Sequence, residues 1–114
     1  MAFRVTPRLV GEIVIVDASG KLALGDGTAR LRQTLRGLFD EGHNRIIVNL
    51  AEVDYVDSSG IGELVTALTT ARRGGGEVKL LQVAHGVRDV LLATKLYTVF
   101  DVHSEEAAAV SSFG

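Results

Sequence analysis

The chain contains no cysteine, no tryptophan and a single proline among its 114 residues. The absence of cysteine excludes a disulfide framework, thiolate metal sites and thiol nucleophiles. Aromatic residues make up only 5% of a sequence that is 46% hydrophobic, so a core must be built mainly from Val, Leu, Ile and Ala. This length is sufficient to bury such a core, and we expect residues 1–114 to form one domain.

The chain also lacks an excess of charge of one sign and any long hydrophobic run. Its 12 basic and 14 acidic residues give a formal net charge of −2 and form no basic stripe that would neutralise nucleic-acid phosphates. No stretch reaches the roughly 18 apolar residues of a membrane-spanning helix, and the first six residues lack the apolar segment of a secretion signal. We therefore expect a cytoplasmic protein that binds neither nucleic acid nor membranes.

Strand-like and helical patterns alternate along the chain, which predicts an α/β fold. Residues 5–10 and 12–18 favour an antiparallel pair, in which Pro7 assigns the first run to a sheet edge. Residues 46–50 are nearly all apolar, which is typical of a central strand covered on both faces. An acidic loop containing Glu52 and Asp54 is expected to follow that strand.

Apolar residues at helical spacing predict two long helices, one before and one after the central strand along the chain. The first has Leu31, Leu35, Leu38 and Phe39 on one face, and the second has Ile61, Leu64, Val65 and Leu68. We expect strands at 77–83 and 98–102, a short helix between them, and a final helix capped by Ser104. Together these elements predict a mixed, mostly parallel sheet of about four to five strands packed with about four helices.

The most informative stretch is the boundary between the central strand and the second helix. Residues 54–62 read Asp-Tyr-Val-Asp-Ser-Ser-Gly-Ile-Gly, so serines stand at the start of a helix. A helix N-terminus has unpaired N–H groups and a partial positive charge, so Ser58 or Ser59 is expected to cap the helix and to be able to carry a phosphate. A plain helix cap is the alternative. Asp57 is interpreted as a solvated acid stabilised by the helix dipole, and the alternative is that it accepts hydrogen bonds at the helix start or lies near a metal held by a visiting enzyme.

The run Asp-Ser-Ser-Gly-Ile-Gly at residues 57–62 resembles the signature of the anti-sigma factor antagonists of the STAS domain family. The resemblance extends over roughly residues 4–110. It includes the initial β pair, a Gly-Lys-Leu turn at 20–22 before the first helix, and a glycine link at 74–76. It implies a single STAS domain in which Ser58 is the regulatory phosphorylation site and Ser59 its capping neighbour.

The resemblance also implies the partners. Unphosphorylated protein would bind an anti-sigma factor that is itself the serine kinase, and a serine/threonine phosphatase would reverse the modification. The family often has an acid just after the Gly-x-Leu turn, where this chain has Ala23. We expect no catalytic residues, no metal and no cofactor. The expected partner-binding residues are Leu24, Asp26, Asp57, Ser58, Ser59, Gly60, Ile61 and Gly62.

The sequence argues against a hydrolase and against a zinc protein. A hydrolase nucleophile elbow needs Gly two residues before its serine, where Ser58 has Val56, and no histidine is matched to it as a base. His43, His85 and His103 lack the spacing of a zinc site. Two alternatives stay open: a STAS scaffold module in a larger signalling assembly, and a small-molecule or nucleotide-binding module.

Overall fold

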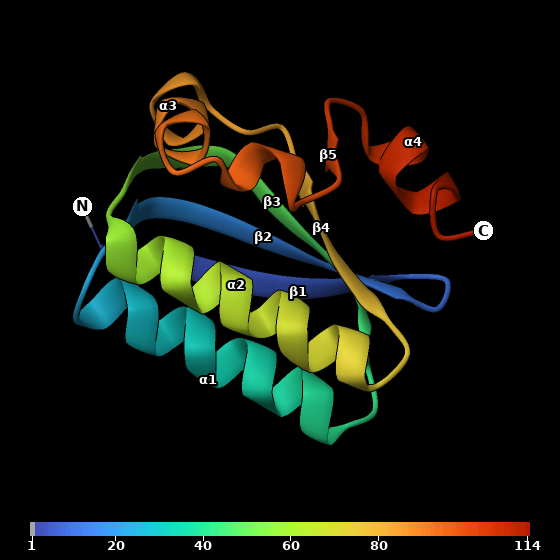
Figure 1. Cartoon of the computed structure of the whole chain (residues 1–114). Coiled ribbons are helices and arrows are strands. Elements are labelled where there is room, and N and C mark those ends of the chain that lie inside the picture. The colour runs from blue at the N-terminus through green and yellow to red at the C-terminus, as the bar shows by residue number, and fades with distance from the viewer. Residues whose placement is uncertain (1) are drawn as a thin grey trace.

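The core of the structure is a five-stranded sheet. The computed structural model describes residues 2–114. The strands are β1 (Arg4–Val10), β2 (Ile13–Leu22), β3 (Arg45–Val56), β4 (Glu77–Leu81) and β5 (Val102–His103). They lie in the order β1-β2-β3-β4-β5; β1 and β2 are antiparallel and the other pairs are parallel. This arrangement confirms the predicted mixed, mostly parallel sheet (Figure 1).

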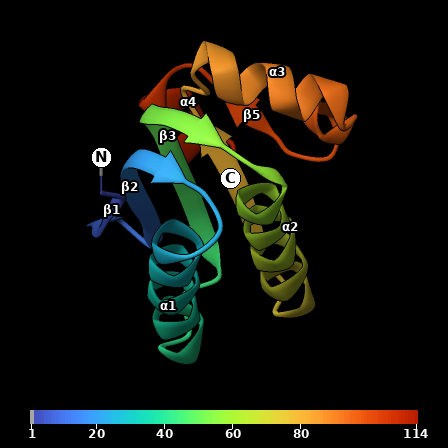
Figure 2. The same cartoon turned by 90° about the vertical axis from the view of Figure 1, so that its left-hand side faces the viewer.

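Four helices and one 3-10 turn complete the fold. They are α1 (Asp26–Asp40), α2 (Ser58–Arg73), α3 (His85–Ala93), η1 (Leu96–Thr98) and α4 (Glu106–Ser111). Figures 1 and 2 show α1 and α2 side by side against one face of the sheet, while α4 packs near β4 and β5. No helix within residues 2–114 is both long enough and apolar enough to cross a bilayer.

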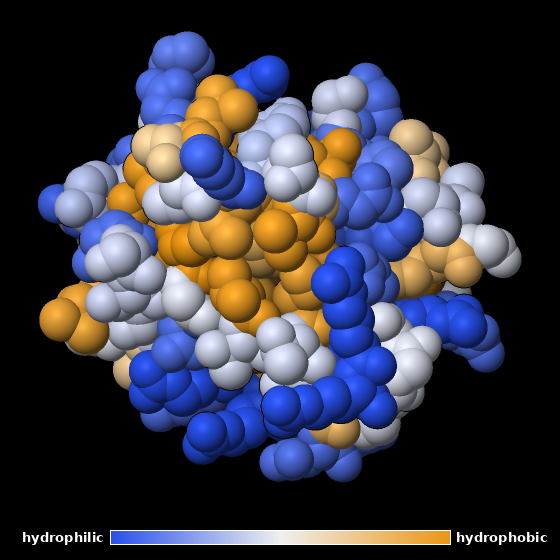
Figure 3. All heavy atoms as spheres, in the orientation of Figure 1, coloured by the Kyte–Doolittle hydropathy of each residue, from blue (hydrophilic) through white to orange (hydrophobic). Residues whose placement is uncertain are grey.

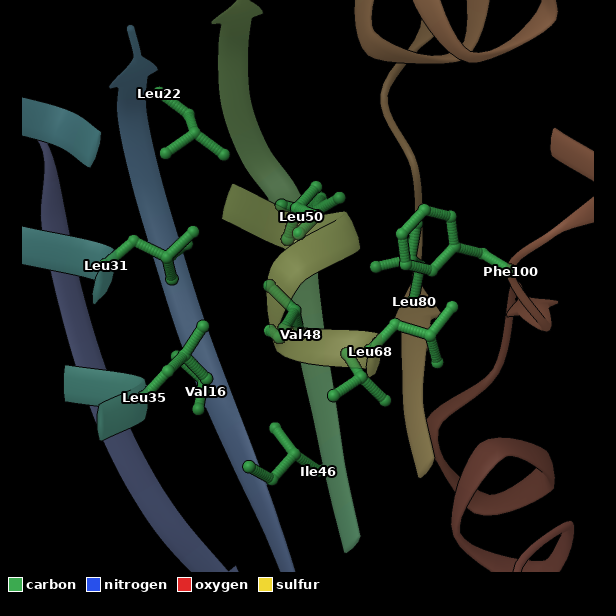
Figure 4. Packing of buried hydrophobic residues seen from close by; sticks show 14 of the residues in the cluster. Val16, Leu22, Leu31, Leu35, Ile46, Val48, Leu50, Leu68, Leu80 and Phe100 are labelled. Atoms are coloured by element: carbon green, nitrogen blue, oxygen red, sulfur yellow. The ribbon is translucent and has the colours of Figure 1, made fainter. Parts of the chain in front are cut away.

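Alternation along the strands divides the buried side chains between two cores. Val16, Val48 and Leu80 belong to the larger core beneath α1 and α2, and Figure 4 shows them meeting Leu31 and Leu68 from those helices. The neighbouring strand residues point to the opposite face, where α4 covers them: Ile13, Ile15, Ile47 and Leu81, with Ala109 from α4. Both faces of the central strands are therefore covered, which explains the nearly continuous apolar run at 46–50.

The face that carries α1 and α2 is mixed in polarity. Figure 3 shows an apolar area near its centre with hydrophilic side chains around it. Val65 of α2 and Leu96 of η1 are among the hydrophobic residues that pack against the larger core while staying partly exposed. The outer surface of this face is thus not uniformly polar.

The central strand is longer than its sequence pattern predicts. β3 continues to Val56 because it stays paired with β2 up to the Leu22–Val56 pair, across two shifts in register. Val53 and Val56 are buried while Glu52 and Asp54 are exposed, as on a half-covered strand. The predicted acidic loop at Glu52 and Asp54 was therefore wrong.

The segment after α3 also differs from the prediction. Residues 96–98 form η1, and only Val102 and His103 pair with β4, so the predicted strand at 98–102 was wrong. The Phe100 N–H donates to the Leu96 carbonyl, which places both side chains toward the core at helical spacing. Ser104 is not the cap of α4, because Glu105 occupies that position and makes no side-chain capping bond.

Charged side chains attach α4 to the sheet. The Lys79 ammonium is buried and donates to Asp101 at 2.9 Å and to the Ser112 hydroxyl at 2.7 Å. At the N-terminal end of the helix, Arg8 of β1 pairs with Asp17 and with Glu106, each at 2.6 Å. These contacts stabilise a six-residue helix that is too short to be stable alone.

Candidate functional site

Asp57, and not a serine, caps α2. Asp57 has extended backbone angles, φ −107° and ψ −177°, and its Oδ1 accepts the Gly60 N–H at 2.9 Å. Ser58 and Ser59 are the first and second residues of the helix, so the predicted serine cap was wrong. An N-cap side chain bonds to the N–H two or three residues later, and Asp57 occupies that position.

Because Asp57 caps the helix, the Ser58 hydroxyl is not used as a helix cap. The Ser58 side chain is exposed, and its oxygen has no hydrogen-bond partner among the residues that the structure describes, 2–114. It lies at the N-terminal end of a 16-residue helix, where the backbone N–H groups and the helix dipole favour negative charge. Ser59, the next residue, is half-buried. Of the two serines, Ser58 is therefore the more accessible to a modifying enzyme.

The second oxygen of Asp57 binds a different segment. Asp57 Oδ2 accepts the Leu24 N–H at 2.9 Å, so one carboxylate connects the loop before α1 to the first turn of α2. The bond from Leu24 and then the bond from Gly60 hold the pKa of Asp57 below its ordinary value, because both stabilise the ionised form. Asp57 is therefore an engaged hydrogen-bond acceptor, which corrects its interpretation as a merely solvated acid.

The loop before α1 presents an apolar side chain to solvent. Leu24 is 78% exposed, the largest value among the exposed large hydrophobic residues. Gly25 follows with φ +109°, a conformation that glycine adopts at little cost. Asp26 begins α1, is exposed, and forms an ion pair with Arg30 at 2.9 Å. The loop thus places Leu24 and Asp26 on the surface, as the sequence interpretation expects of partner-binding residues.

The glycine and isoleucine after the serines face inward. Ile61 is only 4% exposed and belongs to the larger core, so its side chain is not available for the partner binding that the sequence predicts for it. Gly60 is also buried, and a Cβ there would overlap the Leu22 carbonyl oxygen. Gly62 is exposed, with open space around its Cα. The accessible part of the signature therefore consists of Ser58, Gly62 and parts of Asp57 and Ser59.

One surface feature near the site was not predicted from the sequence. Tyr55 is 49% exposed, and the Lys21 ammonium lies 5.7 Å from the centre of its ring. Lys21 and Tyr55 are partners in the β2–β3 register. Lys21 and Tyr55 lie close together because β3 extends to Val56. The sequence did not predict this extension, because the acidic residues before Tyr55 favour a loop.

The described residues contain few features of a catalytic centre. Within residues 2–114, no three His, Cys, Asp or Glu side chains gather as a metal site. His103 lies far along the chain from Ser58 and its Nε2 is 2.9 Å from Asp101. The arrangement around Ser58 therefore supplies an accessible hydroxyl at a helix N-terminus.

Comparisons with known proteins agree with the fold described above. The family model of the STAS domain matches residues 4–109. BtrV of Bordetella bronchiseptica, described as a candidate anti-sigma factor antagonist, is 26% identical over 84 residues, which are 74% of this chain and 72% of BtrV. A Thermotoga maritima protein with the same description has a solved structure with a TM-score of 0.83 at 22% identity, over 96% of this chain and 93% of its own. The structure of phosphorylated SpoIIAA of Bacillus has a TM-score of 0.74 at 21% identity, over 97% of this chain and 98% of SpoIIAA. The solved structures establish the fold.

Proposed function

Because the chain belongs to the STAS domain family, we propose that it is an anti-sigma factor antagonist controlled by phosphorylation of Ser58. BtrV is described as a candidate anti-sigma factor antagonist. SpoIIAA is named as an anti-sigma factor antagonist, and its structure has been solved in unphosphorylated and phosphorylated forms. Antagonists of this family are non-enzymatic regulators. In the cytoplasm, the unphosphorylated protein binds an anti-sigma factor and thereby releases the sigma factor.

The observation that carries the proposal is the exposed, unbonded hydroxyl of Ser58 beside the exposed side chain of Leu24. Asp57 binds the backbone of Leu24 and caps the helix that Ser58 begins, so these two exposed residues lie near each other in the fold. A protein partner that covers this surface would bury Leu24 and exclude water from Ser58. Burial of one leucine side chain contributes about 1.5–3 kcal/mol to such an interface.

Phosphorylation would oppose this binding through charge. The anti-sigma factor, acting as the kinase, transfers the γ-phosphoryl group of ATP to Ser58 Oγ, which releases ADP and the hydroxyl proton. The serine/threonine phosphatase hydrolyses the phosphoserine with water and releases inorganic phosphate. The phosphate brings about −1.5 to −2 charges and three acceptor oxygens. The helix N-terminus tolerates that charge within the free domain. A closely packed interface does not, and a loss of about 2.8 kcal/mol weakens association about a hundredfold.

The proposal is tested with substitutions at the two adjacent serines. Ser58→Ala should bind the anti-sigma factor like the unmodified protein, and Ser58→Glu should bind at least about tenfold more weakly, because one buried charge costs more than about 1.4 kcal/mol. Titration calorimetry measures both affinities. Ser59→Glu is the matched control, since it places the same charge one residue further along α2.

Two results would reject Ser58 as the controlling position. One is equal affinity of Ser58→Ala and Ser58→Glu for the anti-sigma factor. The other is phosphate found by mass spectrometry on a residue other than Ser58 after incubation with the kinase and ATP. A larger effect of Ser59→Glu than of Ser58→Glu would move the site to Ser59.

A further inference from the structure

The contacts of Asp57 suggest a role beyond capping the helix. We propose that Asp57 is a positioning residue that holds Leu24 in a fixed place beside Ser58, so that loop and helix start form one preformed docking surface. The partner in this inference is the anti-sigma factor, and to that extent it rests on the proposed function. The tie itself is a property of the free protein and is tested without any partner.

The two carboxylate oxygens of Asp57 are divided between two chain segments. Oδ1 accepts the Gly60 N–H and Oδ2 accepts the Leu24 N–H, both at 2.9 Å. The second bond joins positions 33 residues apart in the sequence. Hydrogen bonds to an ionised acceptor are about twice as strong as neutral ones, so this carboxylate is well suited to hold two segments together.

The backbone near Asp57 brings the same two segments into close approach. The Asp57 N–H points to the Leu22 carbonyl oxygen at 3.4 Å, and Gly60 packs against that oxygen with no room for a Cβ. The end of β2 and the first turn of α2 are therefore fixed relative to each other. The loop begins directly after Leu22, so Asp57 acts on a segment whose first end is already in place.

The other end of the loop is attached to α1. The Thr28 N–H donates to the Ala23 carbonyl at 3.1 Å, and the Gly25 N–H donates to the Thr28 hydroxyl at 3.2 Å. Among the hydrogen bonds of residues 2–114, the bond to Asp57 is the one that ties the Leu24 backbone to α2. Without it, Leu24 would be held only through its chain neighbours, Leu22 at the end of β2 and Ala23, which is bonded to α1.

Preorganisation explains why such a tie matters for binding. Leu24 is 78% exposed and so gains little from packing within its own domain. A partner that binds Leu24 in an apolar pocket has a higher affinity when the loop is already ordered, because binding then loses no conformational entropy by ordering the loop. The bond between Asp57 and Leu24 also keeps Leu24 at a fixed distance from Ser58, so a partner that binds at Ser58 contacts Leu24 in the same place each time.

Asp57→Asn is the informative variant because a carboxamide has one acceptor oxygen in place of two. Asn is a good helix N-cap, so its one oxygen keeps the bond from the Gly60 N–H, while its NH2 group, a donor, faces the Leu24 N–H and cannot accept from it. Asp54→Asn is the matched control, since Asp54 is an exposed acid three residues earlier with no side-chain hydrogen bond among the described residues. Both variants remove one negative charge, and only one of them touches the tie.

The first experiment measures amide hydrogen exchange by NMR in the free protein. The Leu24 amide should exchange at least about tenfold faster in Asp57→Asn than in wild type, as expected from loss of a charge-assisted hydrogen bond. Asp54→Asn should leave it unchanged. Equal exchange of the Leu24 amide in wild type and Asp57→Asn would overturn the proposal, whatever the protein binds.

The second experiment is a double-mutant cycle on binding of the anti-sigma factor. Leu24→Ala should weaken binding about tenfold in wild type, by loss of a buried leucine side chain. In Asp57→Asn it should weaken binding much less, because Leu24 is no longer held in place. Equal losses in the two backgrounds would overturn the positioning role. Coupling that persists while Ser58→Glu binds normally would support the positioning role and reject the phosphorylation switch.

Discussion

Gly60 gives the sharpest prediction for the stability of the site. The residue lies in the first turn of α2 against the end of β2, and an added Cβ would overlap the Leu22 carbonyl oxygen and stand 2.8 Å from atoms of the Leu22 and Val56 side chains. Side chains can rotate away, but a carbonyl at the end of a paired strand cannot. Gly60→Ala therefore forces apart the helix start and the strand.

The magnitude follows from two opposing effects. Overpacking of this kind costs about 1–3 kcal/mol, and the backbone partner places Gly60→Ala toward the upper end. Alanine recovers at most about 1 kcal/mol through its higher helix propensity, and less in the first turn. We expect a net loss of about 2 kcal/mol in the free energy of unfolding, which lowers Tm by about 8 °C in a domain of this size.

Gly62→Ala is the control within the same helix. Nothing lies within 4 Å of a Cβ at Gly62. The variant should therefore gain about 0.5–1 kcal/mol from helix propensity alone, and its Tm should rise by a few degrees. Urea denaturation followed by circular dichroism measures both variants, and an unchanged m-value verifies that the compared states are the same. A Gly60→Ala protein as stable as wild type would refute the close approach described for this turn.

Three further predictions concern charged groups. The pKa of Asp57 is lowered by two backbone N–H donors, so its contribution to stability is complete above about pH 4 and is lost as the pH falls through the folded-state pKa; acid titration of unfolding should show a shallower loss below pH 4 in Asp57→Asn, and identical curves would contradict this. Lys79→Met should cost about 1 kcal/mol, because it removes donors to Asp101 and to the C-terminal segment while leaving an apolar chain of similar length; faster amide exchange in α4 is the expected sign, and unchanged exchange the contrary one. Arg8→Gln should cost only about 0.5–1 kcal/mol through its pairs with Asp17 and Glu106, since these groups are more than a third exposed; the cost should shrink in 1 M salt, as about a 3 Å screening length implies, and a salt-independent cost would show that packing, not charge, is lost.

The sequence was sufficient to predict the elements whose signals are local. The apolar run at 46–50 marked a doubly covered strand, and Pro7 marked an edge. Gly42, with φ +89°, follows the C-cap of α1, and the glycines at 74–76 follow the last residue of α2, where Gly75 has φ +82°. In each case one residue type or one periodicity is tied directly to a backbone geometry.

The sequence was insufficient where geometry depends on contacts distant along the chain. The bond between Asp57 and Leu24 has no sequence signature, because the spacing of 33 residues depends on how β2 and β3 align. The same alignment lengthens β3 and brings Lys21 to Tyr55. The strand expected at 98–102 failed for another reason: β-branched and aromatic residues there favour a strand by composition, while Leu96 and Phe100 fill the core as a turn.

The single proline has a consequence for behaviour at high concentration. A free sheet edge is a template on which another chain can add a strand and begin a fibril. Here one edge is the two-residue β5, and the other is β1, which Pro7 interrupts near its middle by withholding a backbone donor and fixing φ. Neither edge offers a long, regular row of hydrogen-bonding groups. The sheet thus gives a neighbouring copy no long regular edge on which to add a strand, which disfavours cross-β aggregation.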